Sequence, residues 1–201
     1  MVVCAPSGTG KTTLCKRLLE EFPRIVLSVS CTTRVPRPGE AGGRDYEFID
    51  KEEFVQRRNA GFFAEWAEVH GKFYGTPLEP AWKLLSSGQD VLFDIDVQGA
   101  SQIRSSLPGA RLIFILPPSL HELERRLRAR GTEKEEDLHI RLSAAVRELS
   151  QAHWFDAWII NQDLERAFRE LCAAYIAATL APARRPGFLA ELFSGWNADA
   201  H

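Results

Sequence analysis

The chain has 201 residues, of which 45% are hydrophobic, so it is long enough to bury a substantial core as one domain. Its net charge of -2, from 25 basic and 27 acidic residues, argues against a general binder of nucleic acid or membrane surfaces. The sequence has neither a signal-peptide pattern nor a membrane-length apolar run, and its four cysteines, Cys4, Cys15, Cys31 and Cys172, form no C-x-x-C pair. We therefore expect a cytoplasmic protein with reduced, buried thiols and no membrane or nucleic-acid partner.

The N-terminal stretch is a short apolar run that breaks into a glycine-bearing loop and then a segment with helical spacing. Strand, loop, Gly-Lys-Thr and helix predict a phosphate-binding loop, in which backbone N–H groups hold phosphate oxygens, lysine neutralises them and a hydroxyl ligates Mg²⁺. Ala5 stands where this pattern has its first glycine, and its methyl group fits there only at negative φ. The alternative is an ordinary turn before a helix. The loop residues are Ala5, Pro6, Ser7, Gly8, Thr9, Gly10, Lys11, Thr12 and Thr13.

The next segments alternate between helical and strand patterns. Leucines at 14, 18 and 19 predict a helix over 11–21, and residues 25–30 are typical of a buried strand. Strand, helix and strand indicate a βαβ unit, and hence an α/β fold whose parallel sheet is flanked by helices. Residues 31–77 are irregular, rich in glycine and proline, and contain short strand patterns, which predicts a small β-rich insertion. Within it, Asp50 with Glu53 is a capping signal that predicts a short helix ending near Gly61.

The α/β pattern then resumes and continues to about residue 179. Residues 91–96 form an apolar strand that ends in two carboxylates, and arginines at 126, 128, 130 and 141 surround a charged segment that we expect to act as a mobile lid. The other predicted elements are helices at 78–88, 99–107, 119–130, 133–153 and 164–179 and strands at 111–116 and 157–160.

Several polar residues are expected to share one site. Ligands of open α/β sheets bind beyond the carboxyl ends of the strands, which places Ser30, Asp94 and Asp96 beside the phosphate loop. Strand alternation is expected to direct both aspartates to one face, so that one holds Mg²⁺ or its water; the alternative is a solvated strand end. Arg34 and Arg37 lie in a proline-stiffened loop and suit phosphate, unless they are ordinary surface arginines.

These features together resemble the guanylate kinase family over residues 1 to about 178. The matching stretches beyond the loop are Ser28 to Arg34, Pro36-Arg37, Gly39-Glu40, Gly43 to Phe48, Glu65 to Ala67, Tyr74 to Thr76, Asp94 to Gly99, Arg130 to Thr132, Arg141 to Ser143 and Asn161 to Leu164. The resemblance implies a P-loop nucleoside-monophosphate-kinase fold with a core of 1–30, 78–120 and 155–180. It also implies a GMP-binding insertion of 31–77 and a helical lid of about 121–154, with 181–201 as a tail outside the resemblance.

The resemblance also implies a reaction, in which the γ-phosphoryl group of ATP passes to GMP, and to dGMP, with Mg²⁺ present. It implies that Ser30, Arg34, Arg37, Tyr46 and Tyr74 hold the GMP phosphate and that Glu65, Thr76 and Asp94 read guanine. The implied catalytic residues are Lys11, Arg37, Arg130 and Arg141; Asn161 contacts adenine, Thr12 ligates Mg²⁺ and Asp96 anchors the water shell of the metal. We expect Arg126 and Arg128 to be solvated helix charges.

Guanine recognition is also reasonable on chemical grounds. An ionised Glu65 can accept from the N1–H and the 2-amino group of guanine while Thr76 donates to O6. Adenine presents the reverse pattern, and an unpaired buried carboxylate can reject it by on the order of 10⁴-fold. From the residues alone, however, Glu65, Thr76 and Tyr74 would be assigned to cross-strand pairing at the surface.

Two other functions fit parts of the sequence. A guanylate-kinase-like module that binds peptides without catalysis would not need Gly10-Lys11-Thr12 or the lid arginines. A related P-loop kinase acting on a phosphorylated sugar would not need Glu65 and Thr76 to read a base. The apolar residues at 188, 189, 192, 193 and 196 form one side of a short helix. We expect that side to pack on its own domain, and self-association stays open.

Overall fold

The core of the computed structural model is a parallel sheet with the strand order β2-β7-β1-β8-β9. The structure describes residues 1–69, 71–129, 135–194 and 196. The core strands are β1 (Val2–Cys4), β2 (Ile25–Leu27), β7 (Asp90–Asp94), β8 (Leu112–Leu116) and β9 (Ala157–Ile160). All their pairings are parallel. The predicted α/β class is therefore confirmed.

Both faces of the three central strands are buried, because these strands are apolar apart from Asp90 and Asp94 at the two ends of β7. Successive side chains of a strand point to opposite faces, so Val2 and Cys4 belong to one apolar cluster and Val3 to the other. The cluster around Val3 contains Leu14 and Leu171, from the helices α1 (Lys11–Glu21) and α7 (Leu164–Thr179). The opposite cluster is covered by α3 (Leu78–Ser86) and α4 (Val97–Ser106). The result is a three-layered core.

A second, mostly antiparallel sheet has the strand order β4-β3-β6-β5. Its strands are β3 (Cys31–Thr32), β4 (Glu47–Phe48), β5 (Phe63–Val69) and β6 (Lys72–Pro77). The helix α2 (Lys51–Asn59) packs Phe54 against Phe73 and Cys31 of this sheet. Asp50 caps α2 as predicted, since its side chain accepts from the Glu53 N–H at 2.7 Å.

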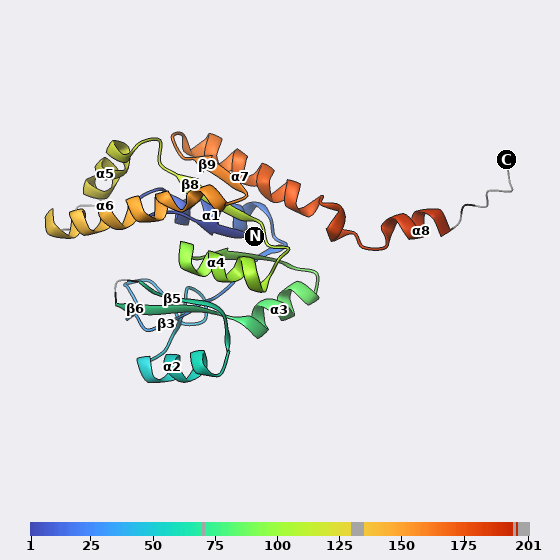
Figure 1. Cartoon of the computed structure of the whole chain (residues 1–201), viewed down its shortest axis with the longest axis horizontal. Coiled ribbons are helices and arrows are strands. Elements are labelled where there is room, and N and C mark those ends of the chain that lie inside the picture. The colour runs from blue at the N-terminus through green and yellow to red at the C-terminus, as the bar shows by residue number, and fades with distance from the viewer. Residues whose placement is uncertain (70, 130–134, 195, 197–201) are drawn as a thin grey trace.

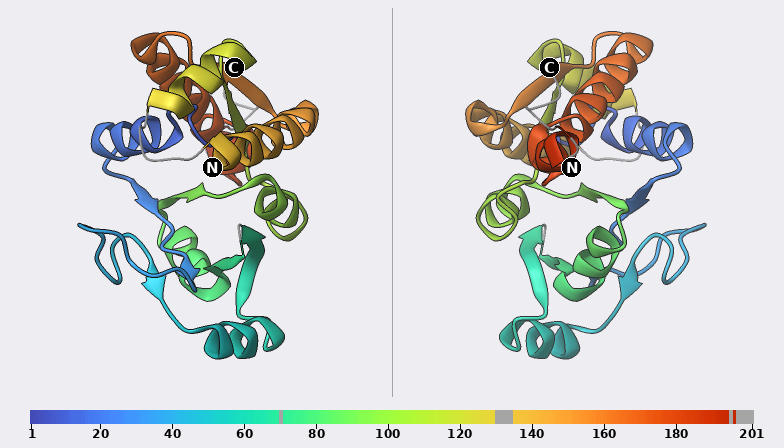
Figure 2. Two further views of the ribbon diagram at one scale, coloured as in Figure 1. Left: turned by 90° about the vertical axis from the view of Figure 1, so that its left-hand side faces the viewer. Right: turned by 90° about the vertical axis from the view of Figure 1, so that its right-hand side faces the viewer.

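A pair of helices lies on the opposite side of the core from this second sheet (Figures 1 and 2). These helices are α5 (Leu120–Ala129) and α6 (Glu135–Ser150), joined through Leu123, Leu127, Leu138 and Ala145. A short 3-10 turn, η1 (Ala152–Trp154), follows α6. The arrangement places α5 directly over the phosphate loop, because a Cβ on Gly8 would approach Leu127 and Leu123 to 3.0 and 3.1 Å.

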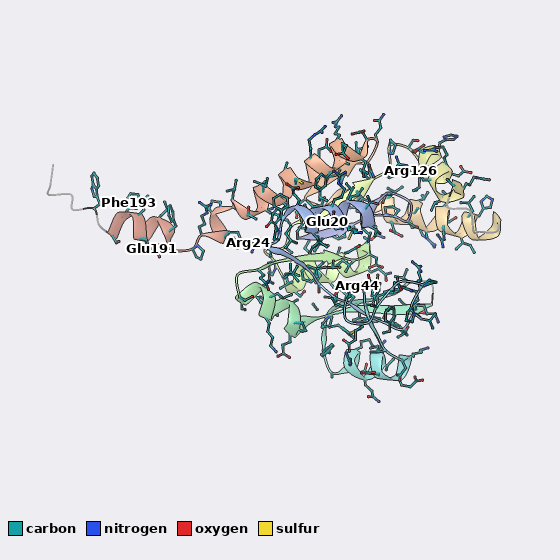
Figure 3. The ribbon with its side chains drawn as sticks, turned by 180° about the vertical axis from the view of Figure 1, so that it is seen from behind. Glu20, Arg24, Arg44, Arg126, Glu191 and Phe193 are labelled. Carbon is teal, nitrogen blue, oxygen red and sulfur yellow. The ribbon has the colours of Figure 1, made fainter. Side chains whose placement is uncertain are left out.

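The C-terminal segment departs from its predicted packing. It contains η2 (Pro182–Arg184) and α8 (Phe188–Ser194), which extends away from the body of the protein, with Glu191 and Phe193 far from the core (Figure 3). Its apolar side chains are 51–65% exposed rather than packed on the domain. The expectation was wrong because helical spacing identifies an apolar face but not what covers it.

Two smaller expectations also differ from the structure. The strand predicted at 25–30 ends at Leu27, and Ser30 lies where the chain crosses into the second sheet. All four cysteines are free thiols, as predicted, but Cys172 is only half-buried. None of the described helices combines the length and the apolar character that a membrane span requires.

The α7 face of the core can be tested by a pair of matched substitutions. Leu171 is 0% exposed, whereas Leu164 on the same helix is 37% exposed. We expect Leu171→Ala to lower the free energy of unfolding by about 2–5 kcal/mol, because it leaves a cavity, and Leu164→Ala to lower it by under about 1 kcal/mol. Urea unfolding monitored by circular dichroism measures both. Equal losses would contradict this packing.

Candidate active site

A cavity of about 260 Å³ lies between the start of α1, the end of β7 and the second sheet. It brings together residues that are far apart in the sequence. Its lining residues are Lys11, Thr12, Ser30, Arg34, Arg37, Tyr46, Glu65, Ala67, Val69, Tyr74, Asp94, Ile95 and Asp96. Thr12, both aspartates and every residue predicted to bind GMP except Thr76 therefore border the same space. Thr76 is fully buried behind the lining residues.

The phosphate loop is held in shape by its own backbone and by Asn161. Gly8 and Gly10 both have φ of 90°, a conformation that residues with a Cβ rarely adopt. Thr9 donates its hydroxyl to the Pro6 carbonyl at 2.8 Å, and buried Asn161 donates Nδ2 to the Thr9 carbonyl at 2.7 Å. A Cβ at Gly10 would lie 2.5 Å from that Nδ2. Asn161 thus supports the loop from beneath.

Lys11 joins the loop to the neighbouring strand. Its Nζ lies 2.5 Å from Asp94 Oδ1 and donates to the Ile95 carbonyl at 3.2 Å. Burial opposes the charge on Lys11, but the Asp94 carboxylate outweighs it, so the pKa of Lys11 lies above its ordinary value. The lysine is therefore a permanent cation at the floor of the cavity.

The two aspartates reach the cavity in different ways, which corrects one prediction. Asp94 ends β7, but Asp96 is not on the strand: it is the N-cap of α4, and its Oδ1 accepts from the Gly99 N–H at 2.8 Å. Strand alternation was thus the wrong reason for placing both carboxylates together. The helix begins two residues earlier than predicted because the Asp96 side chain satisfies the Gly99 N–H, one of the unpaired N–H groups in its first turn.

Glu65 is a buried carboxyl in the wall of the cavity. It is 2% exposed, and its Oε1 accepts from Thr76 Oγ1 at 2.5 Å, while Ser30 Oγ lies 3.0 Å from the same hydroxyl. Burial raises the pKa of Glu65 to about 7. Glu65 and Thr76 do pair across β5 and β6, but the pair is buried, so the expected position at the surface is wrong. The Thr76 hydroxyl has one proton, so while it donates to Glu65 it cannot also donate to a nucleobase.

The predicted phosphate-binding arginines differ in how strongly they are restrained. Arg34 is only 13% exposed in its side chain, donates to both Glu40 oxygens at 2.9 Å and lies 5.4 Å from the Tyr46 ring. It is therefore not an ordinary surface arginine. Arg37 is exposed, although it borders the cavity. Tyr46 and Tyr74 meet edge to face at 6.0 Å and complete this wall.

The arginines of the α5–α6 region are only partly placed. Arg130 lies outside the described residues, and Arg141, half-buried on α6, is not among the cavity-lining residues. Arg126 corrects an expectation, because its side chain is 23% exposed and donates to the Asn161 carbonyl at 3.0 Å. It bridges α5 to the residue that supports the loop. Arg128, which pairs with Glu124, is half-exposed as expected.

Glu148 on α6 was not predicted, and it is a second carboxyl near this centre. Burial raises its pKa to about 7, Lys11 acts in the opposite direction, and Asp96 adds to the increase. Its sequence position held a usable signal. Glu148 follows the buried Ala145 by three residues, so the helical period places it on the inner face of α6.

The donors at the cavity fit a magnesium ion. Thr12 offers a hydroxyl at the first turn of α1, and Asp96 offers a carboxylate that borders the same space. Mg²⁺ prefers oxygen ligands and keeps several waters and substrate phosphates, so one hydroxyl and one nearby carboxylate are a sufficient protein contribution.

Comparisons with known proteins agree with this geometry. The family model described as guanylate kinase matches residues 1–178. The guanylate kinase of Oleidesulfovibrio alaskensis is 64% identical over 98% of this chain and 95% of its own length. That of Nitratidesulfovibrio vulgaris is 62% identical over the same shares. The crystal structure of guanylate kinase from Anaplasma phagocytophilum superimposes with a TM-score of 0.79 at 35% identity, covering 96% of this chain and 91% of that one. With the phosphate loop, the buried carboxyl and both sheets in place, the chain belongs to the guanylate kinase family.

Proposed function

We propose that the chain transfers the γ-phosphoryl group of ATP to GMP, and also to dGMP, giving ADP and the diphosphate, at the cavity described above. The observation that carries this proposal is that one cavity is bordered both by the loop lysine Lys11 and by the buried carboxyl Glu65. A phosphate cradle alone would serve many kinases. A buried carboxyl beside it suits the two adjacent N–H donors that guanine presents, because both of its oxygens can accept at once.

Guanine is proposed to bind against Glu65, Thr76 and Asp94. The ionised Glu65 accepts from N1–H and the 2-amino group, and these two donors replace Thr76 as its partners. Thr76 is then released to donate to O6. Adenine, which places an acceptor at N1, would leave the carboxylate unpaired in a buried position.

The GMP phosphate is proposed to bind among Ser30, Arg34, Arg37, Tyr46 and Tyr74. Arg34 is pre-oriented by Glu40, so little side-chain entropy is lost when phosphate arrives. Arg37, which is exposed, is free to swing toward the phosphate and orient it as the nucleophile. A phosphate oxygen is already a competent nucleophile, so the reaction needs no general base.

The ATP phosphates are proposed to bind along the loop from Ala5 to Thr13, with Lys11 on the outer oxygens. They compete with Asp94 for the Lys11 ammonium, so their arrival releases Asp94 toward the base. Thr12 and Asp96 would hold Mg²⁺. When it is bound, this ion would neutralise part of the negative charge of the phosphates. Asn161 is proposed to contact the adenine from its place behind the loop. Closure of a lid carrying Arg130 and Arg141 would neutralise the transferring group and exclude water.

The same proposal divides the chain by role. The core is 1–30, 78–120 and 155–180, the GMP-binding insertion is 31–77, and the lid is about 121–154, with 181–201 as a tail. We further propose a cytoplasmic location, because a reducing compartment suits the four free cysteines.

The proposed acceptor is tested by measuring ADP release with Mg-ATP and GMP, AMP or ribose bisphosphate. We expect GMP to be used with a kcat/KM on the order of 10³–10⁴-fold above AMP, because only guanine satisfies Glu65. Preferential use of ribose bisphosphate would establish the sugar-phosphate kinase instead. No ADP with any acceptor, together with no binding of Mg-ATP, would indicate the non-catalytic module.

Lys11 is tested by Lys11→Ala, with Lys16→Ala on the exposed side of the same helix as the control. We expect Lys11→Ala to lower kcat by about 10²–10³-fold, because the transferring phosphoryl group loses a fixed cation, with the far-ultraviolet circular dichroism unchanged. Lys16→Ala should leave kcat unchanged. A wild-type rate in Lys11→Ala would remove the phosphate loop from the mechanism.

Glu65 is tested through the pH dependence of GMP binding. GMP binds the ionised carboxyl, whose pKa lies at about 7 in the unliganded protein, so affinity should fall as this group takes up a proton. Between about pH 8 and about pH 6 the fall attributable to Glu65 is roughly tenfold. Titration calorimetry measures it.

The control for this experiment is Glu65→Gln. The GMP phosphate also titrates near pH 6, so the difference between wild type and variant isolates the carboxyl. The variant should bind GMP more weakly at about pH 8 while its KM for ATP is unchanged. Identical pH profiles, or equal losses for GMP and ATP, would refute the assignment of Glu65 to guanine.

A further inference from the structure

The carboxyl of Glu65 is held from its back by the helix α4, whose residues have no part in the reaction proposed above. β5 is an edge strand of the second sheet, so the outer N–H and C=O groups of its backbone have no neighbouring strand to pair with. α4 lies along this edge and supplies the missing partners.

Gln102 provides the main contact between α4 and β5. Its Nε2 donates to the Trp66 carbonyl at 2.7 Å, and its Oε1 accepts from the Trp66 N–H at 3.1 Å. The side-chain amide thus bonds the backbone as a neighbouring peptide group of a sheet would. One helical turn further on, Ser106 Oγ lies 3.5 Å from the Ala64 carbonyl, although its shorter contact, at 3.0 Å, is with the Gln102 carbonyl of its own helix. The residue after Glu65 is therefore bonded to α4, and the residue before it lies close to the same helix.

Gly99 provides the space for the carboxyl itself. A Cβ built on Gly99 would collide with Glu65 Oε2 and lie 3.0 Å from its Cδ. Glycine is unfavourable in a helix by about 0.5–1 kcal/mol relative to alanine, and no positive φ is needed at this position. Glycine is needed at position 99 because the Glu65 side chain lies directly against the backbone of α4, where a side chain would collide with it.

α4 also begins at the phosphate end of the site. Its N-cap Asp96 follows Asp94, the partner of Lys11, by two residues. One rigid helix, α4, therefore contacts both the phosphate end of the site and the strand that carries Glu65, which fixes the distance between the Glu65 carboxyl and the phosphate loop.

We infer that Gln102 and Gly99 are positioning residues that set the selectivity for guanine at its 2-amino group, by fixing the Glu65 carboxyl against α4. This inference rests on the proposed function. IMP is the informative comparison, because its base keeps N1–H and O6 but lacks the 2-amino group. The ratio of kcat/KM for GMP to that for IMP therefore reports how well Glu65 is placed for that one contact.

The test compares this ratio in wild type, Gln102→Leu and Ser101→Leu. Ser101 is exposed on the same helix, so it controls for adding a leucine to α4. We expect Gln102→Leu to lower the GMP-to-IMP ratio by about 10- to 100-fold with KM for ATP unchanged, because β5 loses both amide contacts. Ser101→Leu should keep the ratio. If Gln102→Leu slows GMP and IMP equally, so that the ratio stays within about twofold of wild type, Gln102 is merely structural and the inference fails.

A stability measurement tests Gly99 without relying on activity. We expect Gly99→Ala to lower the urea midpoint of the wild-type chain, because the new methyl group displaces the Glu65 carboxyl. In a Glu65→Ala background the collision is absent, and the same substitution should leave the midpoint unchanged or raise it through helix propensity. An equal effect in both backgrounds would overturn the contact. If the wild type does not phosphorylate GMP, the proposed function fails, while this cycle still decides whether α4 positions Glu65.

Discussion

The ion pair between Lys11 and Asp94 is the contact on which the rest of the site depends. It joins the first residue of α1 to the last residue of β7, across two strands that are neighbours in the parallel sheet. Because parallel strands end at the same edge, the phosphate loop after β1 and the carboxylates after β7 must meet there. The pair also keeps the lysine charged where burial alone would favour its neutral form.

The nucleotide site is built from two sheets that differ in construction. The core sheet is buried on both faces and supplies a rigid edge for phosphate. The second sheet supplies Glu65 and Thr76, whose polar groups are satisfied by each other while they are buried. The helix α4 spans the two, from its cap at Asp96 to the edge of β5 at Trp66. A base and a phosphate loop can thus be held at a fixed separation.

The features that could be predicted from the sequence are those determined by local chemistry. The phosphate loop, the cap at Asp50 and the helix over 164–179 each follow from a short pattern of residues, and each is present. Two of the failures share one cause, which is that their outcome depends on distant segments: Arg126 bonds Asn161 instead of water, and α8 extends from the body. The cap at Asp96 is local, because its partner Gly99 is three residues away, and it was missed because the apolar strand pattern was extended through it.

By itself, the sequence determined the α/β class, the phosphate loop and the family, because periodicity, glycine placement and motif spacing are properties of contiguous residues. The tertiary structure alone decided which side chains are buried and what they face. A surface pair and a base-reading pair have the same spacing in a hairpin, and Glu65 is a buried carboxyl because α4 packs behind β5 and Thr76 lies beside it. For Glu65 this burial comes from the packing of distant segments, which the pattern of residues within one strand does not encode.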